Sequence, residues 1–512
     1  MTALIPLFVV VPLGAAFVVV ILAHVRGLKA LTPLLAVAAV AFNFVAALVM
    51  LGGDPGRLSL LVGEWGLNGT PLGIEMVCDG LTRLMLVTIN LIALASIVFA
   101  RSYMRRFTSV WMFEALFLLM TGAMNGVVLA GDLFNMYVFI EVAAIASYAL
   151  VGFGCETEEL EAAFKYLVLG TVGSALILLG VTVLYSLTGH LNMARVAERL
   201  PVVGATGPAA LLAAVFLLAG LALKAAMVPF HAWLPDAHPS APAPISAMLS
   251  GVLIKAAGVY ALARIVFNVL GPNPQFAMIL IALGALSMVV GVFLAVGQWD
   301  FKRLLAYHSI SQMGYVVLAL GVAAEWAPTD RAIAALCLFG GLFHLFNHAA
   351  FKGLLFLSSG SIEQQAGTRQ LKDMGGLTRT MPLTSFCCRI GALSIAGVPP
   401  FNGFFSKLII IIALVLAGHP VLAGLAVLVA LMTLLSFVKV QRYALEGEPA
   451  GGAKAAREAP APMLAAMLAL AAVCVVSGLA MVLLRDQLFG PASDALLAGA
   501  KGAKQLVVGA MP

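Results

Sequence analysis

Charged residues are scarce in this chain. Only 10% of its 512 residues are Asp, Glu, Lys or Arg, and 62% are hydrophobic, whereas a soluble domain carries about 25% charged residues. Lipid, rather than water, must therefore surround most of the chain. The composition excludes an ordinary soluble protein and predicts an all-α polytopic membrane protein in contact with the lipid bilayer.

Motifs that hold redox cofactors or metals are also missing. No GxGxxG or phosphate-binding loop opens a helix after a strand, and no cluster of metal ligands stands out. The six cysteines form no CxxC pair and mostly lie in apolar runs, as small core residues do. The longest loops, 52–78, 187–207 and 444–460, could not hold a flavin, a nicotinamide nucleotide or an iron–sulfur cluster unaided. We expect no cofactor in this chain, and Fe–S clusters or flavin only in partner subunits.

Apolar runs long enough to cross a bilayer, which takes about 20 residues, occur fourteen times. They lie at 4–23, 30–51, 79–100, 110–130, 133–153, 163–186, 208–233, 243–267, 274–297, 303–323, 331–360, 382–417, 421–443 and 461–484. The first run has no charged segment before it and no small-residue cleavage site, so we expect a first span rather than a signal peptide. Pro or Gly interrupts the runs at 208–233, 331–360 and 382–417, which predicts bent or broken helices there.

The distribution of Lys and Arg in the loops predicts the orientation of the chain. With the N-terminus outside, fifteen of these residues fall on the inner side and seven on the outer side. The outer seven are Arg57, Arg195, Arg199, Arg331, Arg485, Lys501 and Lys504. We expect a multi-pass protein of the cell (inner) membrane with both termini on the outer, periplasmic side. The inner loops account for the net charge of +6, so no nucleic-acid partner is expected.

Several ionisable residues lie inside the apolar runs. Lys224 precedes Pro229 and Pro235, which would open the helix beside the charge. A charge at membrane depth is costly, so it needs a partner or a function. Other such residues, each in a different apolar run, are Glu141, Lys255, Lys352 and Lys407. Their distribution predicts an ion path through the protein.

Glu141 and Lys224 lie at similar depth in their runs, and we expect them to form an ion pair. A static pair would only fix the packing of two helices. The alternative is a pair that opens and closes, so that the lysine takes up and releases a proton, as buried lysines can do.

His344, His348 and Lys352 are spaced four residues apart and form one polar stripe on a helix. Two histidines at this spacing could bind a metal, but the HExxH glutamate is absent and no third ligand is evident. A proton relay fits better, because imidazole can pass a proton through either nitrogen near neutral pH.

Most of the remaining intramembrane charges have local explanations, whereas the sequence offers none for Arg389. Lys407 follows Pro399 and Pro400, where the helix should break and free carbonyls to solvate ions. Lys255 could bridge the two halves of the chain, and His231 lies at the helix break that follows Lys224. We expect three further features: an Asp79–Arg83 pair on one helix face, Arg264 reaching towards the interface, and Asp236 with His238 as caps at a loop end.

An internal repeat is also suggested, because the runs at 208–233 and 382–417 both combine a buried lysine with a Pro-rich break. They are five spans apart, and an odd offset inverts the topology. We expect a three-helix flank (1–100), two inverted five-helix repeats (110–267, helices 4–8, and 274–443, helices 9–13), and a C-terminal helix with a tail (461–512). Helices 7 and 12 of about 14 transmembrane helices would be the broken ones.

Five segments resemble the antiporter-like subunits of respiratory complex I, and relatives of these occur in Mrp cation/proton antiporters (D-type subunit) and energy-converting membrane-bound hydrogenases. The segments are GDLFNMYVFIEV, LKAAMVPFHAWLPDAHPSAPAPISAMLSGVLIKAAGVYALAR, DFKRLLAYHSISQMGYV, LFHLFNHAAFKGLLFLSSGSI and GVPPFNGFFSKL. The resemblance covers residues from about 75 to 445. The long lateral helix of one complex I subunit type is missing, so the chain resembles the shorter members.

The resemblance implies a fold of fourteen helices with two inverted repeats and two broken helices. It also implies roles for the residues that match the family's motifs. The key glutamate falls on Glu141, its partner lysine on Lys224 and the bridging lysine on Lys255. The relay histidines and lysine fall on His344, His348 and Lys352, and the last ionisable residue falls on Lys407. A half-channel would open to each side, joined by a polar axis.

Three functions fit these features. The first is a proton-translocating subunit, with Na⁺/H⁺ exchange not separable from sequence, in a larger complex driven by a distant redox reaction. That complex would resemble NADH:quinone oxidoreductase or a hydrogenase, with homologous antiporter-like subunits, small helical subunits and a peripheral redox arm as partners. The second is a D-type subunit of a non-redox Mrp antiporter. The third is a scaffold with an unused polar axis, which the cost of intramembrane lysines disfavours. In none of these would the chain itself catalyse a redox reaction.

Overall fold

The structure is a computed structural model that describes residues 1–53, 56–63, 66–67, 70–71, 73–205, 207–449 and 451–499, with only the backbone at 66–67 and 70–71. Lys501, Lys504 and the rest of the expected tail lie outside the described residues. The described chain is mostly helical, as the composition predicted.

Twelve helical segments among the described residues are long and apolar enough to cross a membrane. They are α1 (Leu7–His24), α2 (Thr32–Leu51), α3 (Gly80–Tyr103), α4 (Val110–Leu129), α5 (Leu133–Val151), α6 (Thr157–Thr188), Ala243–Leu270, α12 (Pro274–Val296), α13 (Phe301–Trp326), α14 (Arg331–Ala366), α18 with its π-helical end η7 (Pro420–Val440 and Gln441–Leu445) and α19 (Ala461–Leu479). The segment Ala243–Leu270 consists of α10 (Ala243–Met248), π-helix η4 (Leu249–Tyr260), α11 (Ala261–Arg264) and π-helix η5 (Ile265–Leu270).

Three apolar helices are shorter: α8 (Pro208–Lys224), α16 (Pro382–Ala396) and α17 (Asn402–Leu416). They occupy the runs at 208–233 and 382–417, where the sequence predicted interruptions. The run at 331–360 was predicted to be bent or broken. It is not broken, because α14 is a single continuous helix. Its glycines are accommodated without ending the helix.

The remaining elements lie mostly in the long loops. The segment 52–78, predicted as a loop, contains strands β1 (Leu58–Val62) and β4 (Ile74–Cys78), antiparallel with Leu58 opposite Cys78, and the short pair β2 (Gly66–Leu67) and β3 (Thr70–Pro71). The other α-helices are α7 (Met193–Val203), α9 (Leu234–Ser240), α15 (Leu377–Thr380), α20 (Met481–Leu484) and α21 (Gly490–Leu497). Short 3₁₀ turns are η1 (Thr2–Leu4), η2 (Lys29–Leu31), η3 (Met104–Arg106), η6 (Leu371–Asp373) and η8 (Gly451–Lys454), and η9 (Arg485–Phe489) is π-helical.

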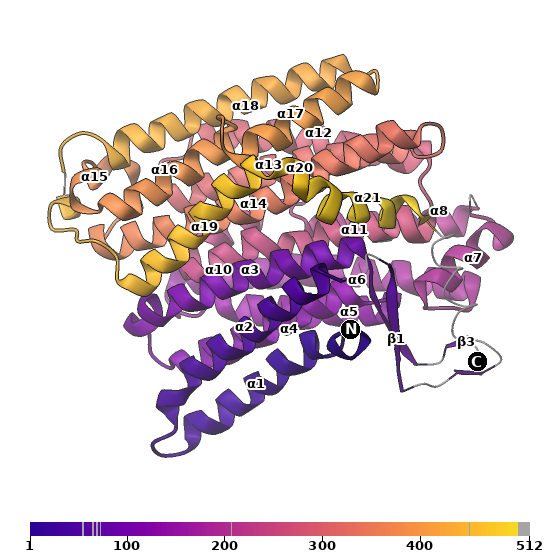
Figure 1. Ribbon diagram of the computed structural model, residues 1–512, viewed down its shortest axis with the longest axis horizontal. Coiled ribbons are helices and arrows are strands. Elements are labelled where there is room, and N and C mark those ends of the chain that lie inside the picture. Colours follow the sequence, from indigo (N-terminus) through magenta and orange to yellow (C-terminus); the bar gives the residue numbers. More distant parts are fainter. Residues whose placement is uncertain are drawn as a thin grey trace.

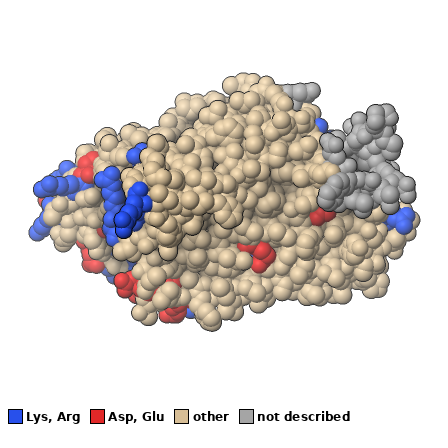
Figure 2. All heavy atoms as spheres, turned by 90° about the horizontal axis from the view of Figure 1, so that it is seen from below, with Lys and Arg blue, Asp and Glu red and all other residues tan. Residues whose placement is uncertain are grey.

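The helices run side by side along the long axis of the molecule, with α1 at one edge and α18 at the opposite edge (Figure 1). The segment Ala243–Leu270 lies in the middle and is buried along almost its whole length. By contrast, α1, α12 and α18 expose wide apolar faces, as helices in contact with lipid do. Lys and Arg gather at one end of the molecule, and the broad surface that follows is mostly uncharged, with a small acidic patch near its middle (Figure 2).

A close backbone approach joins the central segment to the end of α8. A Cβ added to Gly258 would lie 2.5 Å from the Cα of Ala225, the residue after Lys224. Only glycine permits this distance, so η4 packs directly against the helix break beside Lys224.

Gly258→Ala should therefore push the central segment away from α8 and reduce the yield and thermal stability of the purified protein. Gly14→Ala is the matched control, because a Cβ at exposed Gly14 of α1 meets nothing within 4 Å. That change should leave stability equal or raise it by up to about 1 kcal/mol through better helix propensity. Equal thermal stability of both variants in detergent would contradict the close approach.

Candidate functional site: a buried polar path

The first part of the path lies where α8 ends. Lys224 is the last residue of α8, and Ala226 then adopts a positive φ of 54°. The carbonyl of Leu223 accepts hydrogen bonds from the amide of Ala226 at 3.0 Å and from Trp233 Nε1 at 3.1 Å, and the amide of Val228 donates to Ser287 Oγ at 2.9 Å. The interrupted backbone thus finds partners inside the protein, as it must at membrane depth.

Lys224 faces Glu141 of α5, as the sequence predicted. Its Nζ lies 3.4 Å from Glu141 Oε1 and 3.5 Å from the Tyr148 hydroxyl. Ser174 of α6 donates a hydrogen bond to the same carboxylate oxygen. Beside the lysine is a cavity of about 10 Å³ lined partly by Tyr166, which is about the size that holds one water.

Lys255 and Lys352 are fully buried and lie further along the path. Lys255 Nζ donates to the carbonyl of Ser250 at 2.5 Å, inside the π-helical segment η4, and Lys352 Nζ donates to the carbonyl of Leu305. Neither lysine forms a salt bridge with a carboxylate in the described part of the chain. Backbone oxygens, rather than counter-charges, therefore solvate both ammonium groups.

Two serines that the sequence analysis overlooked connect these lysines. Ser250 Oγ lies 2.8 Å from Ser309 Oγ, and Ser309 Oγ donates to the carbonyl of Leu305 at 3.0 Å. The series runs from Lys255 through Ser250, Ser309 and the Leu305 carbonyl to Lys352. The serines inside apolar helices could have been noticed in the sequence. Their contact could not, because the two residues are 59 positions apart.

The two histidines of α14 lie one and two turns before Lys352 in the sequence. His344 Nδ1 lies 2.9 Å from Ser406 Oγ of α17, whereas His344 Nε2 and both ring nitrogens of His348 have no hydrogen-bond partner among the described residues. Both rings are fully buried. Buried polar atoms are nearly always satisfied, so these three ring nitrogens are exceptions within the described chain.

Lys407 lies at the second interruption, where α16 ends at Ala396 and α17 begins at Asn402. Its Nζ donates to the carbonyl of Ile395 at 2.7 Å and lies 5.3 Å from the centroid of the Tyr315 ring. That ring is 5.6 Å from the ring of His344. The path therefore extends from the interruption after α8 to the interruption before α17.

His231 does not join this series. It is half-buried in the irregular segment after α8, and its Nδ1 has no hydrogen-bond partner among the described residues. Asp236 was expected to cap a loop end, but it forms ion pairs with Lys165 at 3.1 Å and with Arg303. His238, expected to share that role, is fully buried with no hydrogen-bond partner for either ring nitrogen within the described chain.

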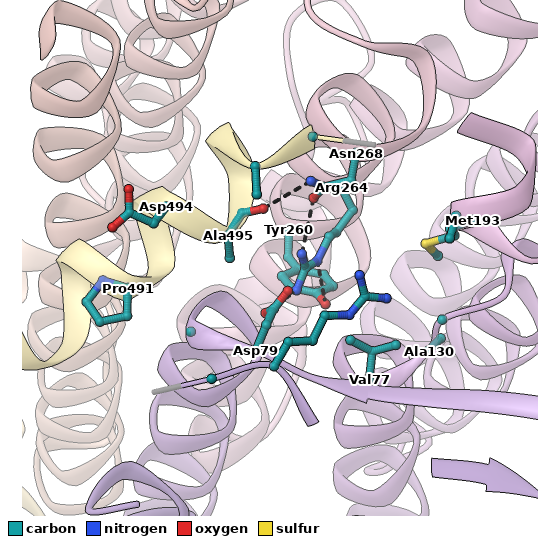
Figure 3. A pocket seen from close by; sticks show the side chains of 17 residues that line it. Val77, Asp79, Ala130, Met193, Tyr260, Arg264, Asn268, Pro491, Asp494 and Ala495 are labelled. Carbon is teal, nitrogen blue, oxygen red and sulfur yellow. Dashed lines mark hydrogen bonds and ion pairs between the residues drawn. The ribbon is translucent and has the colours of Figure 1, made fainter. Parts of the chain in front are cut away.

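The predicted Asp79–Arg83 pair is wrong. Asp79 caps α3 by accepting from the Thr82 amide, and its carboxylate pairs with Arg264 Nη2 at 2.5 Å (Figure 3). Arg83 instead donates to the carbonyl of Gly56 at 2.9 Å. Cap geometry turns the carboxylate back over the first turn and away from the residue four positions on. Arg264, expected to reach towards the interface, is buried by this pair.

The Asp79–Arg264 pair lies beside a cavity of about 480 Å³ between η5, α21 and the β1–β4 hairpin (Figure 3). Burial raises the pKa of the Asp79 carboxyl, but the charge and hydrogen bonds of Arg264 and the Thr82 amide outweigh burial and hold the pKa at about 2. The same arginine bonds the hydroxyl of Tyr260 at 3.0 Å and the side-chain oxygen of Asn268 at 3.1 Å. The pair thus fastens the start of α3 to the central segment.

Arg389 and the potential metal ligands are the last features to place. Arg389, for which the sequence offered no explanation, is half-exposed and lies 3.8 Å from Glu446. No group of three or more His, Cys, Asp or Glu side chains in the described part of the chain is arranged to hold a metal ion.

The chain is similar to several known proteins. Residues 130–433 match the family described as NADH:quinone oxidoreductase/Mrp antiporter, TM. The sequence is 38% identical over 504 residues to NADH-quinone oxidoreductase subunit N of Desulforudis audaxviator (strain MP104C), covering 94% of this chain and 96% of the relative. It is 34% identical to the D-type subunit of the Na(+)/H(+) antiporter of Alkalihalophilus pseudofirmus (strain ATCC BAA-2126 / JCM 17055 / OF4), over 84% of this chain and 85% of the relative.

A solved structure is also similar. A chain of the Mrp complex from Dietzia sp. DQ12-45-1b superimposes with a TM-score of 0.88 at 30% identity, and 99% of each chain is covered. The likeness extends over the whole described fold rather than one part of it.

Asp79→Asn should remove the counter-charge of buried Arg264 and lower the free energy of unfolding by about 3–5 kcal/mol, measured as a fall in Tm in detergent. Because the folded pKa of Asp79 lies below its ordinary 3.8, the pair stabilises fully above that pH and loses its effect only as pH falls towards 2. The difference in Tm should therefore be the same from about pH 5 to pH 9.

Asp494→Asn is the matched control. Asp494 lines the same cavity but pairs with Arg331 at 3.1 Å on the exposed surface, where a pair contributes about 0–1 kcal/mol. A Tm of Asp79→Asn equal to that of this control would contradict a structural role for the buried pair.

Proposed function

Because the chain belongs to the NADH:quinone oxidoreductase/Mrp antiporter family of membrane subunits, we propose that it moves protons, or exchanges Na⁺ for protons, along its buried polar path. One observation carries this proposal. Of the four lysines on the path, only Lys224 faces a carboxylate within the described chain, and the other three bind backbone carbonyls between two helix interruptions. Fixed packing needs no such series of ammonium groups, whereas proton transfer does.

In this proposal the Glu141–Lys224 pair is the switch. While the pair is closed, the carboxylate compensates the ammonium. When Glu141 moves away, the buried ammonium loses its counter-charge, which is costly, and Lys224 passes a proton towards Lys255. The proton then follows Lys352, His348, His344 and Lys407. His231, Asp79 and Arg83 are accessory, Asp79 by holding α3 to the central segment.

The architecture that we propose has about fourteen membrane crossings. The twelve long segments count once each, α8 with α9 forms broken helix 7, and α16 with α17 forms broken helix 12. Residues 110–267 and 274–443 would be inverted five-helix repeats, flanked by residues 1–100 and 461–512. A lysine beside each interruption supports this pairing of the repeats.

We place the protein in the cell membrane with both termini outside. The gathering of Lys and Arg at one end of the molecule supports an inner side there (Figure 2). The β1–β4 hairpin and α7 lie towards the other end and would face the periplasm (Figure 1).

The driving force that we favour is a distant redox reaction in partner subunits, supported by the 38% identity to an NADH-quinone oxidoreductase subunit. The chain would then be a pump subunit of an oxidoreductase complex, without catalysing the redox step. The alternative is a D-type subunit of an Mrp antiporter driven by an ion gradient, supported by the antiporter relative and the Mrp structure. Absorption and low-temperature EPR spectra of the purified native complex separate them, because only the first carries flavin or Fe–S signals.

The face of α5 supports a neighbouring membrane subunit as partner. The side chain of Glu141 is 25% exposed, and Val138 and Ile145 on the same helix are 39% and 61% exposed. A carboxylate does not face lipid, so a second subunit would cover this helix. A homologous antiporter-like subunit or a small helical subunit fits this surface.

Lys224→Ala should lower ion translocation at least about fivefold, since a proton-transfer group contributes a large factor to a rate. Inverted vesicles carrying the native complex would be supplied with electron donor or Na⁺, and a pH-sensitive dye would report the transport. Lys29→Ala, at the exposed turn before α2, is the control and should transport normally. Full transport by Lys224→Ala, with normal assembly of the complex, would refute the proposed path.

Ile145→Cys, introduced with Cys155→Ser to remove an exposed thiol, should form a cross-link to a partner subunit on mild oxidation or with a bismaleimide in native membranes. Phe17→Cys on α1 serves as the comparison. The wild-type Phe17 side chain is 70% exposed and has no buried charge beside it. If Ile145→Cys gives no cross-linked product in the assembled complex, α5 is not the interface.

A further inference from the structure

Helix α13 carries a second polar stripe that none of the steps above uses. His308 and Gln312 are four residues apart, on one face of the helix, and both are fully buried. His308 Nε2 lies 2.9 Å from Ser436 Oγ of α18. His308 Nδ1 and both polar atoms of the Gln312 side chain have no hydrogen-bond partner among the described residues.

This stripe faces the path along its least connected stretch. The carbonyl of Leu305, one turn before His308, accepts from Lys352, and Tyr315, one turn after Gln312, lies beside His344 and Lys407. Numbers rise along α13 as they fall along α14, so the two helices are antiparallel. Along this pair of helices, His308 and Gln312 therefore lie at the level of His348, between the Lys352 contact and the His344 contact.

Six of the buried polar atoms that have no hydrogen-bond partner among the described residues lie on these two helices. They are His308 Nδ1, Gln312 Nε2 and Oε1, His344 Nε2, and His348 Nδ1 and Nε2. A histidine kept only for packing would be expected to have both nitrogens satisfied or to be replaced by an apolar ring. Six such atoms on two facing helices require water between them.

Three positive charges act on His308. They belong to Lys352 of α14, Lys407 of α17 and Lys439 of α18. Lys439 is fixed elsewhere, because its Nζ donates to the carbonyls of Val296 and Gln298 at 2.7 and 2.6 Å, at the end of α12. Like charges in a water-poor interior repel strongly, so His308 can hold a proton when Lys352 or Lys407 has released one.

We propose that His308 is a proton-carrying residue of the path between Lys352 and Lys407, and that Gln312 holds the water that connects it to His344. The inference rests on the proposed ion-translocating function. Lys352 gives up one ammonium proton and becomes a neutral amine, while His308 Nδ1 receives it through water and becomes imidazolium, with Nε2–H donating to Ser436. The same proton then leaves Nδ1 through water towards His344 and the neutral amine of Lys407, so charge is conserved at each transfer.

Three variants of the full-length chain in its native complex test this inference. His308→Gln keeps a side chain able to bond Ser436 but cannot carry a proton. Ser436→Ala removes the hydrogen bond and leaves the imidazole. Thr433→Val, one turn earlier on α18, is the matched control, because buried Thr433 bonds only the carbonyl of Val429 in its own helix. Transport would be measured in inverted vesicles and divided by the amount of complex assembled on a native gel.

The expected result is a loss of at least about tenfold for His308→Gln, as for a proton-transfer group, with a smaller loss for Ser436→Ala and none for Thr433→Val. A purely structural histidine gives the reverse order, with His308→Gln near wild type and Ser436→Ala impaired, and that order overturns the proposal. Gln312→Leu should also reduce transport with His308 intact, and full transport by that variant overturns the role of Gln312.

Lys224→Ala in the same series separates this inference from the function on which it rests. If Lys224→Ala is inactive and His308→Gln transports normally, the path stands and the His308 inference fails. If both variants transport as wild type does, the proposed function itself fails.

Discussion

Solvating a buried ammonium group is the requirement on which the rest of this structure depends. The hydrocarbon core of the bilayer offers no oxygen atoms, and the interior of a regular helix offers few, because each carbonyl accepts from the amide four residues on. Two of the buried lysines take their oxygens where helices are irregular, and Lys352 takes the carbonyl of Leu305 within α13. Lys407 binds the carbonyl of Ile395 at the end of α16, and Lys255 binds the carbonyl of Ser250 within a π-helical segment.

The same requirement explains why interrupted helices and buried charges coincide. A break frees carbonyls for a lysine but also frees amides that need acceptors. Beside Lys224, Ser287 Oγ accepts from the amide of Val228, and Trp233 Nε1 donates to the carbonyl of Leu223. Beside Lys407, Asn347 of α14 donates to the carbonyl of Asn402, the first residue of α17, at 3.0 Å. Each interruption is therefore held by side chains from other helices, which ties the local geometry of a lysine to the packing of the whole molecule.

The sequence made the charges predictable and left many of their partners unpredictable. A lysine or glutamate in an apolar run stands out, and a following proline marks a helix end, so Lys224, Glu141 and Lys407 could be found and Lys224 paired with Glu141. Asp79 shows the limit, because spacing suggested Arg83 while the true partner, Arg264, is 185 residues away. Ser250 with Ser309, and His308 with Ser436, are likewise long-range contacts. In α14, glycines suggested a break, yet tertiary packing keeps the helix continuous.

Water is the component that this account requires between Lys352 and Lys407. The most direct test is a cryo-EM map of the native complex at a resolution that shows ordered water elsewhere in the protein interior. The account predicts density for a series of waters within hydrogen-bond distance of His348, His344 Nε2 and Gln312, continuous from Lys352 to Lys407. A dry interior at these atoms, in a map that resolves buried water elsewhere, would contradict a proton path through this part of the protein.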